Sequence, residues 1–457
     1  MKLTRRTLLA TSAAATLLPR SVFAQTALTL TAVEGSQHIA PEGYPDTNIW
    51  GYEGGVPGPT IRAKQGETVV REFVNKLPQG SSVHWHGVRI DNAMDGVVGL
   101  TQDAVASGQS MRYDFVAPDA GTYWYHPHNR TWEQMARGLY GPLIIEETTP
   151  PDVDQDEVFL IDDWRLTQEA AIDESFEQAM DWSHGGRIGN WVTANGKAPF
   201  DHPVKLNERI RLRLINVANS RIFELGIEGL EGVSVALDGQ PLDKPMAVDR
   251  ISLAPAQRMD LIVDVTAQEG QQGALVLRGG DQDYQLVRFP VAGMARPARM
   301  APPAPLPANP VPVLGDLQSA RRFDLLMEGG AMGQMRQAMV DGEMRDARSL
   351  ASDGQFWALN GVAGLPEAPL LVAERGETII VRIINDTAFA HAMHLHGFHF
   401  RTLGADGSQG PLRDTVLVER TETVEIAFVA DNPGDWLFHC HMLEHTAAGM
   451  LTWIEVT

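Results

Sequence analysis

Short apolar runs separated by turn-forming residues make up most of this chain. Thr60 to Asn75 reads TIRAKQGETVVREFVN, and Val372 to Asn385 reads VAERGETIIVRIIN. Alternate residues of a strand point to the same face of a sheet, so these runs predict β-strands with one face on a core. The 43 Gly and 28 Pro residues favour short strands joined by turns over long helices. The pattern predicts an all-β fold of antiparallel sandwiches, with Trp164 to Met180 as the main candidate helix.

The chain contains three copies of this strand pattern. Gly66 and Gly376 each begin a Gly-Glu-Thr segment that ends in Asn after the same interval. Val204 to Asn219, which reads VKLNERIRLRLINVAN, is a weaker copy between them. Copies this far apart indicate related β-domains rather than a short-period solenoid. The middle copy lacks the histidine pairs of the other two, and we interpret it as a spacer or a contributor to a substrate pocket.

Two proline-containing segments divide the chain where three domains require it. Thr148 to Glu157 is acidic and contains two prolines, and Ala295 to Pro312 carries seven prolines that predict a stiff, extended connector. A chain of 457 residues has room for several domains, because a single core rarely grows beyond roughly 250 residues. We expect an export signal at residues 1–24, domains at 25–147, 152–296 and 315–457, and a linker at 297–314.

The first residues have the pattern of an export signal. Lys2, Arg5 and Arg6 form a positively charged start, an apolar and small-residue segment follows, and Val22-Phe23-Ala24 is similar to a cleavage site. Thr4 to Leu9, TRRTLL, resembles the twin-arginine signal of proteins that are exported folded. The alternative is an ordinary secretory signal with two chance arginines. Either signal places the mature protein outside the bacterial cytoplasm, and we expect it in the periplasm.

Net charge and the single cysteine narrow the function further. A formal net charge of −21 argues against nucleic acid as a partner, because its phosphates would be repelled. No stretch after the N-terminus is long and apolar enough to predict a membrane span. Cys440 has no second cysteine with which to form an internal disulfide in an oxidising compartment, so its presence needs another explanation.

Four His-X-His pairs stand at matching positions in the first and third copies. Chance predicts about 0.4 such pairs for 14 histidines in this length. Both members of a pair on a strand point to one face, so packing the first domain against the third would bring eight imidazoles together. Neutral nitrogen ligands suit late first-row metal ions, with copper favoured by affinity. The pairs are His84/His86, His126/His128, His394/His396 and His439/His441.

Cys440 occupies the position that Pro127 has in the first copy, and further metal-binding residues surround it in the sequence. His391 lies upstream, and His445 and Met450 follow. Two imidazoles, one thiolate and a distant thioether are the ligand set of a blue copper site. Strand alternation points the cysteine away from its two histidine neighbours, so such a site would be joined to the histidine cluster by two short covalent paths.

In this order, the motifs resemble the four signatures of the multicopper oxidases. They read His-Trp-His-Gly, His-Pro-His, His-x-x-His-Leu-His-Gly and His-Cys-His-x-x-x-His-x-x-x-x-Met. The resemblance covers nearly the whole mature chain and implies three cupredoxin-like Greek-key β-sandwich domains. One departure is Ala392, where the family motif often has Pro; it affects loop rigidity rather than ligation. The resemblance implies four copper ions: type 1 at His391, Cys440, His445 and axial Met450, type 2 at His84 and His394, and a type 3 pair at His86, His126, His128, His396, His439 and His441.

The resemblance also implies an oxidoreductase, with O2 as its acceptor. A small donor would give up electrons one at a time at type 1 copper, and O2 would be reduced to two water molecules at the other three coppers. Asp95 and Glu444 stand where the similar copper-efflux oxidases place proton-relay carboxylates. The alternatives are a turn aspartate before Gly96 and a solvated surface glutamate. We expect the protein to be a monomer.

The electron donor has two candidates. Met327, Met332, Met335, Met339 and Met344 form a methionine-rich stretch, and soft thioethers favour Cu(I). However, the second, third and fourth of these follow helical spacing, which is more typical of core packing. The other candidate is laccase-type oxidation of phenols or aromatic amines docked near His445.

Other classes of protein fit the sequence less well. A copper-free structural or division-associated protein of this fold would lack the cysteine and most of the histidines, whereas every expected ligand is present. An electron carrier or copper store would need only the Cys440 site and would leave the histidine pairs unexplained. Copper-type nitrite reductases do not share the motif around Cys440.

Overall fold

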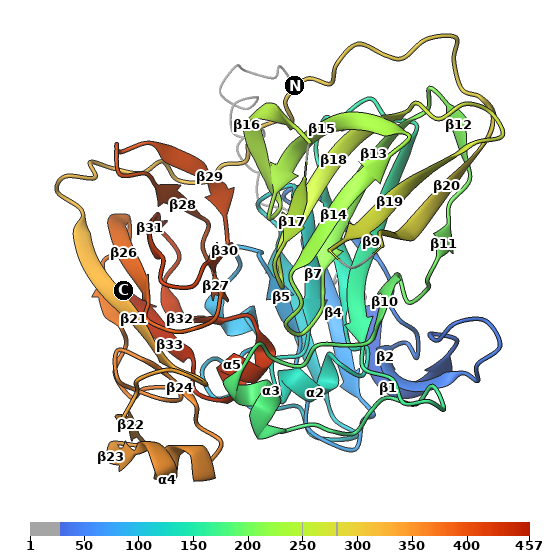
Figure 1. Ribbon diagram of the computed structural model, residues 1–457. Helices are drawn as coiled ribbons and strands as arrows, with labels where there is room; N and C mark the ends of the chain where they lie inside the picture. The colour runs from blue at the N-terminus through green and yellow to red at the C-terminus, as the bar shows by residue number, and fades with distance from the viewer. Residues whose placement is uncertain (1–27, 249, 280–281) are drawn as a thin grey trace, which may run out of the picture.

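The computed structural model describes residues 28–248, 250–279 and 282–457, and these form a protein built almost entirely of β-strands. Three successive stretches, 28–146, 155–294 and 321–456, each form a pair of packed sheets, here named the first, second and third units. The third unit, orange and red, lies beside the blue first unit and the green second unit (Figure 1). The all-β prediction is confirmed. The predicted export signal lies outside the described residues.

The first unit packs two four-stranded sheets around a core that includes Phe73, Trp85 and Tyr113. In spatial order the sheets are β2 (Thr47–Tyr52), β1 (Leu28–Gln37), β4 (Thr68–Asn75), β6 (Ser110–Val116), and β3 (Ile61–Lys64), β8 (Gly141–Glu146), β7 (Gly121–His126), β5 (His84–His86). Two short helices lie outside them, the 3-10 helix η1 (Asn92–Met94) and α2 (Thr131–Gln134).

The second unit packs two larger sheets around Phe223, Leu261 and Phe289. One sheet has the order β10 (Trp191–Ala194), β9 (Gln155–Trp164), β13 (Arg209–Asn216), β18 (Arg258–Val265), β15 (Leu230–Leu237), β16 (Gln240–Ala247). The other has β11 (Phe200–Asp201), β20 (Tyr284–Met294), β19 (Gln272–Arg278), β14 (Phe223–Glu228), β17 (Ile251–Leu253), with β12 (Val204–Leu206) also paired to β20.

The third unit is built in the same way around Trp357, Phe400 and Trp436. One sheet has the order β24 (Trp357–Leu359), β21 (Arg321–Gly329), β26 (Glu377–Asn385), β31 (Thr423–Ala430), β28 (Phe400–Leu403), β29 (Gln409–Arg413). The other has β25 (Leu371–Ala373), β33 (Leu451–Val456), β32 (Gly434–Cys440), β27 (His391–Leu395), β30 (Thr415–Val418). A hairpin of β22 (Gln337–Val340) and β23 (Glu343–Asp346) leads into α4 (Ala347–Ser352), and α5 (Leu443–Ala447) follows β32.

The repeated strand seen in the sequence has the same place in all three units. It forms β4, β13 and β26, and each of these pairs in parallel with the opening strand of its unit. The Asn that ends each copy explains why the pattern stops there. Asn75, Asn216 and Asn385 each accept a bond from the backbone N–H two residues later and donate to a carbonyl four or five residues later. One side chain thus shapes the same loop three times.

The predicted helix from Trp164 to Met180 is wrong. β9 continues to Trp164, and the helix in this region, α3, spans only Ala179–Ser183. Ala170 and Glu177 have φ values of 59° and 61°, which a right-handed helix cannot accommodate. The apolar residues of the segment, such as Ile172, instead fill a core between the first and second units.

The helical spacing of the methionines also proves misleading. Met332 lies in a turn with φ of 65°, and Met339 is on β22, so these residues do not share a helix face. Met327 is fully buried in the third core, whereas Met332 and Met344 are exposed. Their spacing therefore does not indicate a packed stripe.

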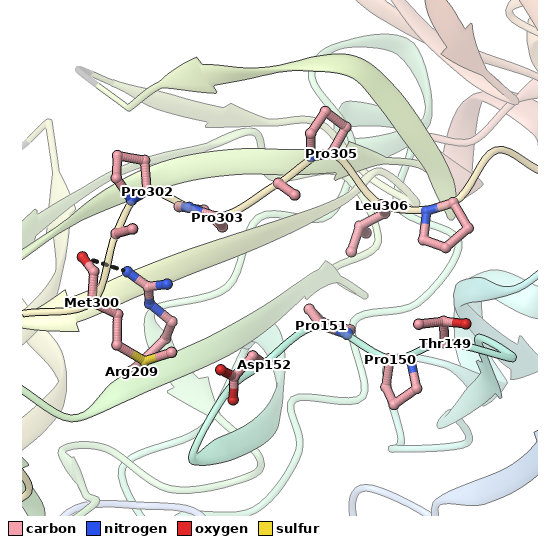
Figure 2. A pocket seen from close by; sticks show the side chains of 13 residues that line it. Thr149, Pro150, Pro151, Asp152, Arg209, Met300, Pro302, Pro303, Pro305 and Leu306 are labelled. Carbon is pink, nitrogen blue, oxygen red and sulfur yellow. Dashed lines mark hydrogen bonds between the residues drawn. The ribbon is translucent and has the colours of Figure 1, made fainter.

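The proline-rich connector lies against the second unit. Residues 300–307 run in extended form over the sheet, and Leu306 is buried beside Val235 and Ile262 (Figure 2). Arg209 donates to the carbonyl of Met300 at 3.3 Å, and a cleft of about 420 Å³ lies between the connector and residues 149–152. Among the described residues, no helix has the length and hydrophobicity needed to cross a bilayer.

Strand β13 places arginines on a buried face. Isoleucine and leucine alternate with Arg209, Arg211 and Arg213, and the arginine side faces carboxylates and the first unit. Asp260 accepts bonds from Arg211 at 2.6 Å and from the Thr122 hydroxyl of the first unit at 2.7 Å. Buried charges need such partners, so this network fixes how the two units dock.

The Asp260→Ala variant should lose roughly 3 kcal/mol of unfolding free energy, because it leaves buried guanidinium groups without a carboxylate. Chemical denaturation measures this loss. The matched control is Asp201→Ala, which breaks an exposed pair with Arg288 and should leave stability nearly unchanged. Equal losses in the two variants would contradict the assigned role of the buried network.

Candidate metal centre

Strand pairing places the histidine pairs of each unit opposite one another. On the first unit β5 pairs with β7 so that His84 faces His126. On the third unit β27 pairs with β32 so that His394 faces His439. The two units therefore present equivalent groups of imidazoles, each fixed by a two-strand ladder.

The two groups meet at the interface of the first and third units, here named the histidine seam. The ring of His86 stacks on that of His394 with centroids 3.9 Å apart, and the ring of His84 lies 4.0 Å from that of His396. His128 lies 5.3 Å from His439. All eight rings are brought together, and His128 alone of the eight is partly exposed.

Backbone carbonyls set the orientation of these rings. The Nδ1 of His84 lies 2.8 Å from the carbonyl oxygen of Asp95, and the Nδ1 of His394 lies 2.9 Å from that of Asp414. A carbonyl only accepts, so Nδ1 carries the proton and Nε2 carries the lone pair. The same argument applies to His126 and His439, whose Nδ1 atoms contact the carbonyls of Pro127 and Cys440.

Several ring nitrogens in the seam lack hydrogen-bond partners. Within the described residues this holds for Nε2 of His84, His126 and His394 and for both ring nitrogens of His86 and His441. Burial lowers the pKa of the rings well below its ordinary value, which keeps them neutral. The imidazoles with this lowered pKa are His86, His126, His128, His396, His439 and His441. Neutral rings with free lone pairs aimed at one another are suited to metal ions of the copper and zinc type.

His391, Cys440 and His445 form a second group, here named the cysteine site. The Sγ atom lies 3.7 Å from each Nδ1, and the two Nδ1 atoms are 3.1 Å apart. Their Nε2 atoms are held elsewhere, by the Thr387 hydroxyl at 2.8 Å and by the His184 carbonyl at 2.6 Å. Two nitrogens and one sulfur therefore converge with their lone pairs free.

Burial raises the pKa of the Cys440 thiol to about 12, so the thiolate requires a bound cation. Met450 is buried in the same core, and its backbone is bonded to Cys440 and His445. The residues present thus fit a blue copper site, with a thioether close in the fold. His439 and His441, on either side of the cysteine, belong to the seam, so one tripeptide joins the two sites.

Both sequence-predicted carboxylates lie beside these sites. Asp95 is 2% exposed, and its carboxylate lies 3.0 Å from the Nδ1 of His396. Glu444 is also 2% exposed and accepts bonds from Asn219 at 2.8 Å and Ser220 at 2.7 Å. Burial raises the pKa of Glu444. A solvated surface glutamate is therefore excluded, and Asp95 is more than a turn residue.

The cysteine site is covered by a segment of the second unit. His445 is fully buried beneath residues 179–184, here named the cap, which comprise α3 and His184. The Trp357 ring lies 4.4 Å from that of His445, and its Nε1 donates to the carbonyl of Trp182 at 2.6 Å. Figure 1 shows α3 beside α5. The cap thus separates the His445 ring from the solvent.

A cavity of about 310 Å³ borders the seam on the side of His128 and His439. Its wall is mixed: Val97, Trp132 and Leu443 are apolar, whereas Asn129 and Arg130 are polar. It offers a route for a small uncharged molecule to the partly exposed His128.

Sequence reasoning missed Asp414, Arg258 and the cap. Asp414 is fully buried between the histidine pairs, and Arg258 of the second unit contacts it at 2.6 Å. Neither residue belongs to a repeated motif, so only the packing of the three units reveals them.

Comparison with known proteins agrees with these features. Residues 34–150, 155–282 and 339–457 each match families described as multicopper oxidase. The multicopper oxidase MmcO of Mycobacterium tuberculosis is 29% identical over 90% of this chain and 84% of its own. A copper resistance protein A homolog of Pseudomonas syringae pv. tomato is 26% identical over 88% of each chain. The structure of Lac15, from a marine microbial metagenome, is 44% identical, with a TM-score of 0.78 over 94% of this chain and all of that one.

Proposed function

Because the chain belongs to the multicopper oxidases, a family of copper-dependent oxidoreductases, we propose that it couples the oxidation of a small donor to the reduction of O2 to water. The observation that carries this proposal is the tripeptide His439-Cys440-His441, which joins the cysteine site to the histidine seam. The copper-free alternative is not favoured, since every expected ligand side chain is present and buried or nearly so.

The cysteine site is proposed to hold type 1 copper: His391, Cys440 and His445 would bind it, and the thioether of Met450 would be a fourth ligand. The 3.7 Å distances from Sγ to the two Nδ1 atoms support the set, and Thr387 fixes the orientation of one ring. His84 and His394 are proposed to hold type 2 copper. A type 3 pair completes the four ions, at His86, His126, His128, His396, His439 and His441.

When bound, these ions supply a one-electron acceptor at the cysteine site and a four-electron reductant of O2 at the seam. The protein supplies the route between them, the exclusion of bulk water and the protons. Asp95 and Glu444 are the proposed relay carboxylates, because one contacts a seam imidazole and the other is a buried carboxylate that directly precedes His445. The cavity beside His128 is the proposed path for O2.

Four electrons must reach each O2 if this division of roles is correct. Turnover should therefore consume one O2 for every four one-electron donors oxidised and release no hydrogen peroxide. An oxygen electrode measures the ratio, and catalase added at the end should liberate no oxygen. Two donor molecules oxidised per O2 consumed, with accumulation of hydrogen peroxide, would contradict the proposal.

We favour Cu(I) as the donor over phenols and aromatic amines. The cap prevents an aromatic ring from stacking on His445, and its outer surface carries soft ligands. Met180 is 66% exposed and Met332 is 80% exposed, and the Ala331 N–H donates to the Ser183 carbonyl at 2.6 Å. This bond brings the loop of Met332 to the cap.

Replacing both Met180 and Met332 by Leu should lower kcat/KM for Cu(I) about tenfold, the effect of losing about 1.4 kcal/mol of binding. The value for a phenol should stay within about twofold, because leucine keeps the shape of the cap. The control replaces Met246 and Met294, which are also exposed, in the same way; Met246 is on β16 and Met294 pairs with β12, and Figure 1 shows both strands at the end of the second unit opposite α3. Unchanged Cu(I) turnover in the cap variant would overturn this choice of donor and favour laccase-type oxidation.

The remaining assignments rest on the sequence pattern. We propose domains at 25–147, 152–296 and 315–457 with a linker at 297–314, export by the signal at residues 1–24, and a periplasmic monomer. Relatives named for copper resistance are consistent with a role outside the cytoplasm.

A further inference from the structure

Asp95 and Asp414 hold equivalent positions on the two sides of the histidine seam. His84 and His394 are the first members of matching pairs, and their Nδ1 atoms contact the backbone carbonyls of Asp95 and Asp414 at 2.8 and 2.9 Å. The sequence conceals this equivalence, because the two separations along the chain are 11 and 20 residues.

The carboxylate of each of these aspartates also contacts a histidine of the other unit across the seam. Asp95 of the first unit contacts His396 of the third unit at 3.0 Å. Asp414 of the third unit lies 3.4 Å from the Nε2 of His86 of the first unit. Each aspartate therefore orients a ring of its own unit through its carbonyl and contacts a ring of the other unit through its carboxylate.

Asp414 differs from Asp95 because the second unit binds it. The guanidinium of Arg258, on β18, donates to both carboxylate oxygens at 2.8 and 2.6 Å, and both residues are fully buried. The same guanidinium donates to the carbonyl of Thr122 in the first unit at 3.2 Å. One side chain thus contacts all three units within reach of the seam.

Gly87 shows how closely this pair fits the histidine motif. Its φ is +83°, and a Cβ at this position would collide with the Arg258 guanidinium and the Asp414 carboxylate. The glycine directly follows His86, so the backbone of the His-Trp-His-Gly motif packs on the ion pair. The position of His86 therefore depends on the place of Arg258.

We propose that Arg258 is a positioning residue for the copper ions of the seam. It holds the Asp414 carboxylate in one orientation with a planar, two-bond contact that lysine cannot reproduce. Asp414 in turn accepts a hydrogen bond from His394 through its carbonyl, and its carboxylate lies 3.4 Å from the Nε2 of His86. The second unit contributes none of the proposed ligands, but through Arg258 it holds a residue that contacts two of them. It is therefore more than a spacer. This inference rests on the ligands proposed for the seam.

The test uses the copper-loaded, full-length enzyme and the variant Arg258→Lys, which keeps the buried positive charge. During dialysis against a chelator, seam copper should be lost about tenfold faster than from the wild type, the effect expected when a partner of a metal ligand is disturbed. The blue absorption of the Cys440 site should persist, and the electron paramagnetic resonance signal of the type 2 copper should change. Asp414→Asn should show the same pattern.

Asp260→Asn is the matched control for a purely structural effect. Asp260 is buried in the same interface, pairs with Arg211 and bonds to Thr122, but it contacts none of the seam histidines. This variant should unfold at a lower temperature and keep seam copper at the wild-type rate. The inference would be overturned if Arg258→Lys retained seam copper as well as the wild type, or if it lost the copper of the Cys440 site as fast as that of the seam. It would also be overturned if Asp260→Asn lost seam copper as fast as Arg258→Lys. Failure of the wild type itself to bind seam copper would instead refute the proposed function.

Discussion

Eight imidazoles packed into one interface present buried lone pairs for which the described protein groups offer few hydrogen-bond donors. The backbone carbonyls of Asp95 and Asp414 accept hydrogen bonds from the Nδ1–H groups of His84 and His394. The Nε2 lone pairs of these two rings therefore point toward the seam. Buried lone pairs without donors are costly, and several of them facing one another would repel. Bound metal ions remove this cost. The strand register, the duplicated units and the glycine after His86 all serve to bring these lone pairs together.

The same constraint explains why the second unit has so many buried charges. Its arginines contact both other units beside the seam. The arginine face of β13 meets carboxylates of its own unit and a hydroxyl of the first unit. Arg258 continues this pattern to the third unit. The cap from the same unit then covers His445.

Much of this arrangement could be predicted from the sequence, because the signals are local. Two histidines on alternate positions of a strand share a face wherever the strand lies, and duplication makes the faces meet. Asp414 and Arg258 could not be found in this way. They are 156 residues apart and meet only because three units pack together. The helix expected at Trp164 to Met180 failed for a related reason, since Ile172 and its neighbours pack on another unit rather than on one helix face.

If Cys440 joins two copper sites of different kinds, its removal should empty one of them and leave the other. Copper content per chain and the visible spectrum, measured for the wild type and for Cys440→Ser, distinguish the two sites. We expect four copper ions with intense blue absorption in the wild type. We expect three ions without that absorption in the variant, whose fold and seam copper persist. Blue absorption that survives the substitution, or a wild type that binds one copper ion alone, would contradict this expectation.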